Sequence, residues 1–292
     1  MNNLKLLLSD IFPFLIVFLY VVYVDFIKFF FQNYLAEYFK VDEKNLKKIE
    51  IDLKFFKEVS SIEELQEMKY RCEELKFIFF ATLFYLIILC IVVFIIAPQY
   101  SYDLIDYLKL NSENLLFRVI KSLILIFNLL LLYSGHLLEF YFYRVNPISK
   151  TGIRFWMESV YAPIIEEFIF RFVVFNILKI NGHSPVKSSL ISSLMFGISH
   201  LRHLLDRKSY PKKIIFQILY TGIFGFYCCY AYTYSNTIFC PMILHIICNN
   251  LQIPHFAYVH DDKYFPPNKK ILTTITYISG ILGFIFLTYL FH

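Results

Sequence analysis

The sequence predicts an all-α fold, a polytopic membrane helix bundle of about eight transmembrane helices, and two observations predict it. The 292 residues are 58% hydrophobic and only 17% charged, with a mean hydropathy of +0.56, which is far more apolar than a soluble domain of this length. The apolar residues also gather into runs of about 20, the length that a helix needs to cross the hydrocarbon core. Runs this long exclude barrel strands, so only helices can satisfy the backbone in lipid.

The expected spans follow one another along the whole chain. The first lies close to the N-terminus and is too long for the apolar part of a signal peptide, so we expect it to be a retained span. The fifth and the seventh are the shortest and the most polar. The expected spans are Leu7–Phe31, Phe77–Ala97, Leu115–Gly135, Phe155–Ile180, Pro185–His200, Lys213–Tyr234, Thr237–Ile253 and Ile271–Phe291.

The loops between the spans indicate the orientation. With an even number of spans, one side of the membrane receives the four hydrophilic loops that hold most of the lysines and arginines, and the positive-inside rule places that side in the cytosol. These loops are residues 37–76, 136–154, 201–212 and 254–270. The net charge of +5 therefore reflects topology and contact with membrane lipid, and we expect no nucleic-acid partner.

We expect one integral membrane domain over residues 1–292, with a charged insertion and a chemical core. The insertion, residues 37–76, alternates lysine with glutamate and carries Ser61 and Glu64 at the spacing of a capping box, which predicts a solvated cytosolic helix pair. The core, residues 152–252, holds polar residues that spans rarely tolerate. The six cysteines include no CxxC pair and are interpreted as small core residues.

The fourth span carries two carboxylates and a guanidinium, which are costly in lipid unless they are paired or face water. Glu167 and Arg171 stand four residues apart on one helical face, so we expect an ion pair that supports the structure. Glu166 lies ~100° around the helix from Glu167 and can point elsewhere, which makes it the candidate general base. The alternative is one buried polar network of all three residues that packs helices.

Two further spans add polar side chains. The fifth ends at His200 and is followed by His203, which we interpret as an interfacial residue. The seventh holds His245 and Asn249 four residues apart on one face, where they could donate hydrogen bonds to an oxyanion or join helices by packing. The topology places these side chains and Glu166 in the cytosolic half of the bilayer. Together they predict hydrolysis of an acyl bond in a water-accessible pocket.

Three motifs in this order and spacing resemble the CAAX protease and bacteriocin-processing superfamily. They are Glu166-Glu167-x-x-x-Arg171, Phe196-x-x-x-His200 and His245-x-x-x-Asn249. More narrowly, residues 152–252 resemble the eukaryotic type II CAAX prenyl endopeptidases, the Ras-converting enzymes. The flanking residues Arg154 and Ala162-Pro163 fit the same resemblance.

The resemblance implies a multi-pass protease of the endoplasmic reticulum membrane whose active site faces the cytosol. Its partners would be prenylated CAAX-tail proteins such as small GTPases, from which it would remove the last three residues. The resemblance also implies that Glu166 and His200 activate the attacking water while His245 and Asn249 hold the oxyanion. It calls for no metal or other cofactor.

Three alternatives remain open from the residues themselves. A zinc metalloprotease could use Glu166, His200 and His245 as ligands, although the chain has no HExxH motif, which excludes the other class of CAAX protease. A cysteine protease could use Cys248, although a buried thiol is a poor nucleophile. A scaffold or transporter could use the polar cluster as a relay, although neither repeat symmetry nor Gly-broken spans are visible.

Overall fold

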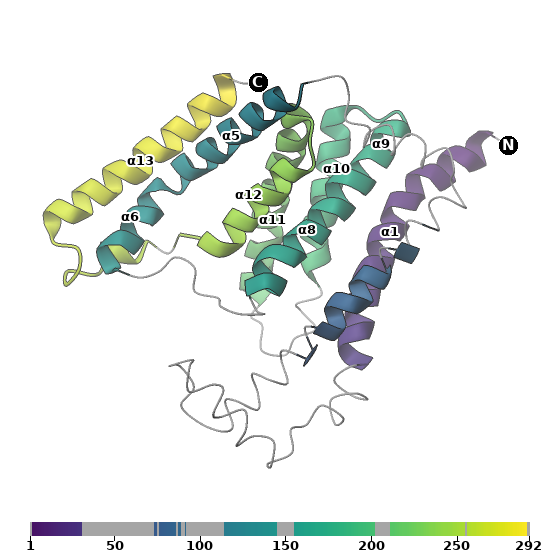
Figure 1. The fold of residues 1–292 in the computed structure, drawn as a ribbon, viewed down its shortest axis with the longest axis horizontal. Helices are drawn as coiled ribbons and strands as arrows, with labels where there is room; N and C mark the ends of the chain where they lie inside the picture. The colour runs from purple at the N-terminus through teal and green to yellow at the C-terminus, as the bar shows by residue number, and fades with distance from the viewer. Residues whose placement is uncertain are drawn as a thin grey trace, which may run out of the picture. The chain divides into compact units, whose positions relative to one another are not determined.

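The structure is a computed structural model that describes residues 2–30, 73–74, 76–85, 87–88, 91, 114–144, 155–201, 211–254 and 256–290. Within these ranges every regular element is a helix, so the predicted fold class is confirmed at that level (Figure 1). The chain divides into two compact units, residues 1–13 with 102–292, and residues 14–101. Apart from residues 73, 74 and 76, the predicted insertion 37–76 lies outside the described residues.

Among the described residues, three helices are long and apolar enough to cross a membrane, and they coincide with three of the predicted spans. They are Leu115–Leu132, Ile214–Ser235 and Pro267–Leu290. Shorter apolar helices, Ile11–Ile27, Lys76–Tyr85 and Phe239–Leu251, lie within or overlap three more predicted spans. The protein is therefore a helical membrane protein with several candidate spans, and the number eight stays a prediction.

The helix α1 (Asn2–Phe30) begins in the larger unit, and in the smaller unit its residues 14–30 pair with residues 76–85, which are also helical. Two tyrosine hydroxyls donate across this pair to backbone carbonyls, Tyr23 to Ala81 at 2.8 Å and Tyr85 to Ile16 at 3.1 Å. The two tyrosine rings stack with their centroids 5.0 Å apart. Because these hydroxyls find acceptors inside the pair, both tyrosines can be placed between apolar helices without leaving a polar group unpaired.

The larger unit holds the predicted core. Its elements are α5 (Leu115–Leu132), α6 (Ser134–Tyr143), η3 (Phe155–Tyr161), α8 (Ala162–Glu167), η4 (Phe168–Phe175), α9 (Asn176–Ile180), α10 (Pro185–Ser199), α11 (Pro211–Ser235), α12 (Phe239–Leu251), η6 (Ala257–Val259) and α13 (Pro267–Leu290). α12 packs against α5, α8 and α11, while α10 packs against α11 and η4. The helices that bear the three motifs are thus neighbours.

The fourth predicted span is a continuous helix from residue 155 to residue 180, but its winding changes along its length. The elements η3 and η4 are π-helical and flank the short α-helix α8. A π-helix is wider than an α-helix, is rare, and is found frequently at functional sites. Pro163, near the start of α8, has no N–H to donate to the preceding turn. The backbone of the fourth span therefore departs from α-helical winding on both sides of α8.

Small apolar residues fill the interior around α12. Cys228, Cys229, Cys240 and Cys248 are all buried and none forms a disulfide, so their interpretation as small core residues is confirmed. Two of them join a cluster of buried side chains from α5, α11 and α12. Its members are Leu125, Leu129, Tyr133, Ala231, Cys240, Leu244, Cys248 and Leu251. This packing fixes α12, and hence His245, against its neighbours.

Candidate active site

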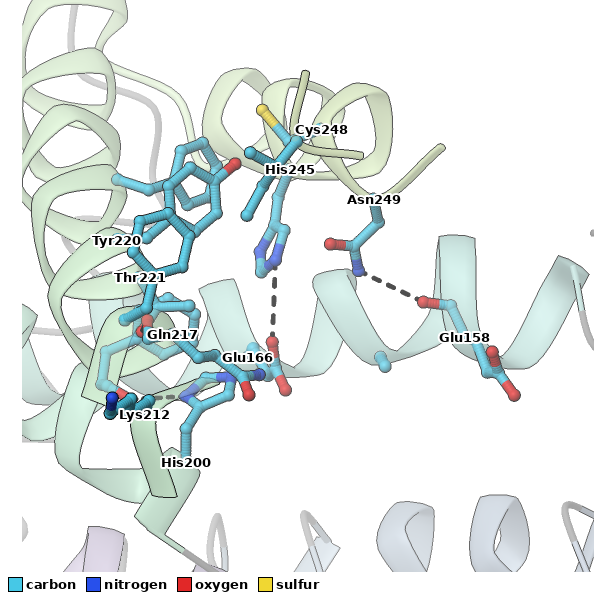
Figure 2. A pocket seen from close by; sticks show the side chains of 15 residues that line it. Glu158, Glu166, His200, Lys212, Gln217, Tyr220, Thr221, His245, Cys248 and Asn249 are labelled. Carbon is cyan, nitrogen blue, oxygen red and sulfur yellow. Dashed lines mark hydrogen bonds and ion pairs between the residues drawn. The ribbon is translucent and has the colours of Figure 1, made fainter. Parts of the chain in front are cut away.

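A cavity of about 780 Å³ opens between the elements that carry the three motifs (Figure 2). Glu166, His200, His245 and Asn249, the four residues predicted to carry the chemistry, all line it. The remaining lining residues are Glu158, Ala162, Phe196, Lys212, Phe216, Gln217, Tyr220, Thr221, Phe224, Cys248 and Ile253. Residues that are far apart in the chain are thereby brought to one hollow that is large enough for part of a peptide.

Glu166 and His245 face each other inside this cavity. The Oε2 atom of Glu166 lies 3.7 Å from Nε2 of His245, and the two side chains are 14% and 7% exposed. Glu166 is therefore the more accessible of the two, while Glu167, the next residue, has a fully buried side chain. The two adjacent carboxylates point to different surroundings, as the helical spacing predicts.

The carboxylate of Glu167 contacts two side chains, those of Arg171 and His245. Its Oε2 atom lies 3.1 Å from Nε of Arg171, in the ion pair that the spacing predicts. Its Oε1 atom accepts a hydrogen bond of 2.8 Å from Nδ1 of His245, a contact that the sequence does not predict. Because Nδ1 is held by Glu167, Nε2 is the ring nitrogen that meets Glu166. Glu167 thus couples the buried guanidinium to the imidazole in the cavity.

The guanidinium of Arg171 is completely buried and lies next to Phe196 and Gly225. Its central carbon lies 4.5 Å from the centre of the Phe196 ring, within the range of a cation–π contact. On another side, a Cβ atom at Gly225 would stand 2.8 Å from Nη2, so a larger residue there would have to displace the guanidinium. A buried charge is tolerated only when it is compensated, and Glu167 supplies the opposite charge.

His200 sits directly after the last residue of α10 and is fixed by its own helix. Its Nδ1 atom lies 3.0 Å from the carbonyl oxygen of Phe196, and its ring packs edge-on against the ring of Phe196. With Nδ1 donating to the carbonyl, the unprotonated nitrogen of the neutral ring is Nε2. His203, interpreted as interfacial, lies outside the described residues.

Asn249 is tied to the helix that bears Glu166. Its Nδ2 atom donates to the carbonyl oxygen of Glu158 at 3.2 Å. In the π winding of η3 this carbonyl would bond to the N–H of the residue five positions on, but that residue is Pro163 and has no N–H. Asn249 supplies a donor in its place. Because a carboxamide has two N–H groups, the second remains for another acceptor.

Another wall of the cavity comes from α11, whose residues are not among those that the sequence motifs predict. It contributes Lys212, Phe216, Gln217, Tyr220, Thr221 and Phe224. The ring of Phe224 packs against that of His245 with a centroid distance of 5.0 Å. The polar members recur at helical spacing on one face of an apolar span, and this periodicity is the signal that could have identified them.

A metal site would need a convergent set of ligands. Over the part of the chain that the structure describes, no three His, Cys, Asp or Glu side chains gather in an arrangement that could hold a metal ion. Glu166, His200 and His245, the proposed zinc set, line one cavity without forming such a group. The donor geometry therefore does not fit the zinc alternative.

Comparison with known proteins agrees with the motifs. Residues 149–251 match the family model described as type II CAAX prenyl endopeptidase Rce1-like. CAAX prenyl protease 2 of Arabidopsis thaliana is 24% identical over 149 residues, which cover 48% of this chain and 45% of the plant protein. CAAX prenyl protease 2 of Homo sapiens is 26% identical over 113 residues, which cover 36% of this chain and 34% of the human protein.

A bacterial protein is also similar. YdiL of Bacillus subtilis, whose name describes a membrane peptidase, is 34% identical over 113 residues, which cover 37% of this chain and 39% of that protein. The chain thus spans less than half the length of each of these relatives. No solved structure matches it. The resemblance that the three motifs predict is confirmed, and the matched range 149–251 nearly coincides with the predicted core 152–252.

Proposed function

We propose that this protein is an intramembrane endopeptidase that removes the last three residues from prenylated CAAX proteins, because residues 149–251 match the family model of the Rce1-like type II CAAX prenyl endopeptidases. The observation that carries the proposal is the cavity in which Oε2 of Glu166 lies 3.7 Å from Nε2 of His245. His200 and Asn249 line the same cavity. A base, two imidazoles and a carboxamide around one accessible cavity are the groups that peptide hydrolysis needs.

In the proposed reaction a water molecule is held between Glu166 and His200. Glu166 accepts one of its protons while its oxygen attacks the carbonyl carbon of the scissile peptide bond. The carbon–nitrogen bond then breaks, and the proton held by Glu166 passes to the leaving amine. The products are a new carboxylate on the prenylated cysteine and a free tripeptide. No electron carrier or further reactant is required.

The negative oxygen of the tetrahedral intermediate is the charge that the remaining residues would stabilise. Asn249 has one N–H on the Glu158 carbonyl and a second N–H for this oxygen. His245 can donate from Nε2 only when both ring nitrogens carry protons, because Nδ1 is bonded to Glu167.

The cellular setting is also part of the proposal. The distribution of lysine and arginine among the loops favours a cytosolic opening of the cavity. Prenylated CAAX-tail proteins such as small GTPases would then arrive with the lipid in the membrane and the peptide in the cytosol. The endoplasmic reticulum membrane is proposed from the resemblance to eukaryotic enzymes alone, and imaging of a fluorescent fusion with a reticulum marker tests it.

The decisive experiment compares hydrolysis of a farnesylated CAAX peptide with that of its unprenylated twin by the purified chain in lipid nanodiscs. We expect wild type to cleave the lipidated peptide alone, releasing a tripeptide that mass spectrometry identifies. Glu166→Gln, His200→Ala and His245→Ala should each lose activity by about a hundredfold or more while remaining folded. His260→Ala, which changes an exposed histidine away from the cavity, is the matched control. Equal turnover by folded Glu166→Gln would overturn the assignment of the base.

A further inference from the structure

One face of α11 forms a wall of the cavity over three helical turns. Lys212 stands at the beginning of this wall, and Phe224 stands at its end, against His245. The step from Lys212 to Tyr220, another wall residue, corresponds to ~12 Å along the helix axis. The wall therefore offers a charged end, a polar middle and an aromatic end to whatever lies in the cavity.

The positively and negatively charged side chains that line the cavity lie at different positions along it. Among the described residues that line the cavity, Lys212 is the one lysine or arginine, and Glu158 and Glu166 are the carboxylates. Figure 2 shows Lys212 at one end of the group and Glu158 at the other, with Glu166 and His245 between them. The side chain of Lys212 is exposed, and no ion pair joins it to any other described residue. Its ammonium group is therefore available to an anion that enters from outside.

A peptide substrate has one anion that is always present, the carboxylate at its C-terminus. That carboxylate is attracted by Lys212 and repelled by Glu158, so the charges favour one direction of the peptide along the cavity. Three extended residues span ~10 Å, which is similar to the length of wall between Lys212 and Tyr220. A carboxylate held at Lys212 would thus leave the peptide bond three residues upstream near the middle of the cavity.

We infer that Lys212 binds the free C-terminal carboxylate of the peptide substrate and so selects the bond that is presented to Glu166. This inference rests on the proposed function for the nature of the substrate. It adds a specificity residue on α11, outside the three motifs. Lysine suits this role because its ammonium is a compact charge on a flexible stem that can follow the carboxylate of different tails.

The test uses two farnesylated peptides of the same sequence, one ending in a free carboxylate and the other in a carboxamide. The kcat and KM values of the full chain in nanodiscs are measured for both, with wild type, Lys212→Met, Lys212→Arg and Lys187→Met. Lys187 is an exposed lysine of α10 that does not line the cavity, so it is the matched control. The ratio of kcat/KM for the acid to kcat/KM for the amide reports the recognition of the carboxylate.

We expect wild type and Lys187→Met to prefer the acid by about tenfold or more, mainly through KM, because a charge-assisted hydrogen bond is lost with the amide. In Lys212→Met this preference should fall to near unity, and in Lys212→Arg it should persist. A preference that Lys212→Met leaves unchanged, or an enzyme that cleaves acid and amide equally in wild type, overturns the inference and leaves the proposed function intact.

Binding of the same peptides, measured by fluorescence anisotropy with Glu166→Gln, separates the two proposals. If wild type cleaves neither peptide, but Glu166→Gln binds the acid more tightly than the amide and loses this preference when Lys212→Met is added, the proposed function fails and Lys212 remains a carboxylate-binding residue. Equal binding of acid and amide overturns the role of Lys212.

Discussion

The Nδ1 atom of His245 lies 2.8 Å from the carboxylate of Glu167, so a side chain of α12 is held by a residue of α8 that is 78 positions earlier in the chain. The other oxygen of the same carboxylate lies 3.1 Å from Arg171. Because Glu167 is fully buried, its side chain has little freedom to form other contacts. The orientation of the His245 imidazole consequently depends on the carboxylate of Glu167, which does not line the cavity.

The first prediction concerns Glu167 as the residue that positions His245. Glu167→Gln keeps an oxygen near Nδ1 but removes the charge, and we expect kcat for the farnesylated peptide to fall by about a hundredfold, as when a catalytic group is misplaced by ~1 Å. KM should change much less, because Glu167 does not line the cavity. Kinetics of the folded variant, checked by size exclusion and circular dichroism, give this split. A rise in KM with kcat unchanged would contradict the positioning role.

The contribution of the ion pair between Glu167 and Arg171 to stability can be measured separately. Glu167→Ala leaves Arg171 as a buried, unpaired charge, which typically costs about 3–5 kcal/mol. Adding Arg171→Met removes that charge, so the double variant should be destabilised by less than the sum of the two single variants, with a coupling of about 1–3 kcal/mol. Thermal unfolding of the four proteins in one detergent measures the coupling, and strict additivity would argue against the ion pair.

The second prediction concerns Asn249, for which we propose the role of an oxyanion donor. If Asn249 is an oxyanion donor, the variant Asn249→Ala should have a kcat lower by about 10²–10³ with little change in KM. If Asn249 only supports the carbonyl of Glu158, the same variant should have a lower melting temperature, and the kcat of its folded fraction should be unchanged. Asn250→Ala is the control, because the amide of Asn250 bonds within its own helix, to Ile246, and does not line the cavity.

Contacts between neighbours on one helix can be predicted from the sequence, whereas contacts between helices that are distant in the chain cannot. The pairing of Glu167 with Arg171 was predictable because four residues of a helix bring two side chains to one face. The bond between Glu167 and His245 was not, because no spacing rule connects positions 78 residues apart. That bond depends on how α12 packs against α8, which only the folded chain determines.

The winding of the fourth span shows a second kind of limit. Ideal α-helical spacing predicts the placement of Glu166, Glu167 and Arg171, whereas π-helical turns flank α8. Pro163 was visible in the sequence, but the consequence for the Glu158 carbonyl appears only with Asn249 beside it. Apolar helices, in contrast, were located closely: the seventh span, predicted at Thr237–Ile253, is a helix from Phe239 to Leu251. Hydrophobic length identifies a span, but it does not determine how its backbone winds.

The third prediction concerns pH and the loop between α12 and α13. Lys270 donates a hydrogen bond of 2.7 Å to Asp262 and thereby lowers the pKa of that exposed carboxyl. A lowered pKa in the folded chain means that the pair stabilises the fold above the unfolded value of about 3.9, and that this contribution is lost as pH falls through the folded pKa. In Lys270→Met the pKa of Asp262 should rise toward its ordinary value, while the melting temperature at neutral pH hardly changes because the pair is exposed.

Carboxyl carbon shifts of Asp262 followed between pH 2 and pH 7 provide the measurement for that prediction. Lys263→Met is a suitable control, because Lys263 bonds to Asp261 through its backbone N–H, which the substitution keeps. An unchanged titration of Asp262 in Lys270→Met would show that another group lowers its pKa.

The fourth prediction concerns the contact between α13 and α5. A Cβ atom at Gly280 would overlap the carbonyl oxygen of Leu131 and the hydroxyl of Ser134, and a backbone oxygen cannot rotate aside. Gly280→Ala must therefore push the two helices apart, at a cost of about 1–3 kcal/mol. Gly283 is the matched control on the same helix, since its Cβ would make an ordinary contact at 3.4 Å with a methyl group of Leu131. Gly283→Ala should stabilise by up to ~1 kcal/mol, because alanine favours the helix over glycine.

Melting temperatures of both variants, recorded with the kcat of the folded protein, decide this prediction. Neither glycine lines the cavity, so Gly280→Ala should lower the melting temperature and leave kcat near that of wild type. Equal melting temperatures for the two variants would mean that α13 and α5 do not approach each other as closely as Gly280 requires. A loss of kcat in Gly280→Ala at full folding would instead connect the α5–α13 contact to the walls of the cavity, through the packing of α12 against α5.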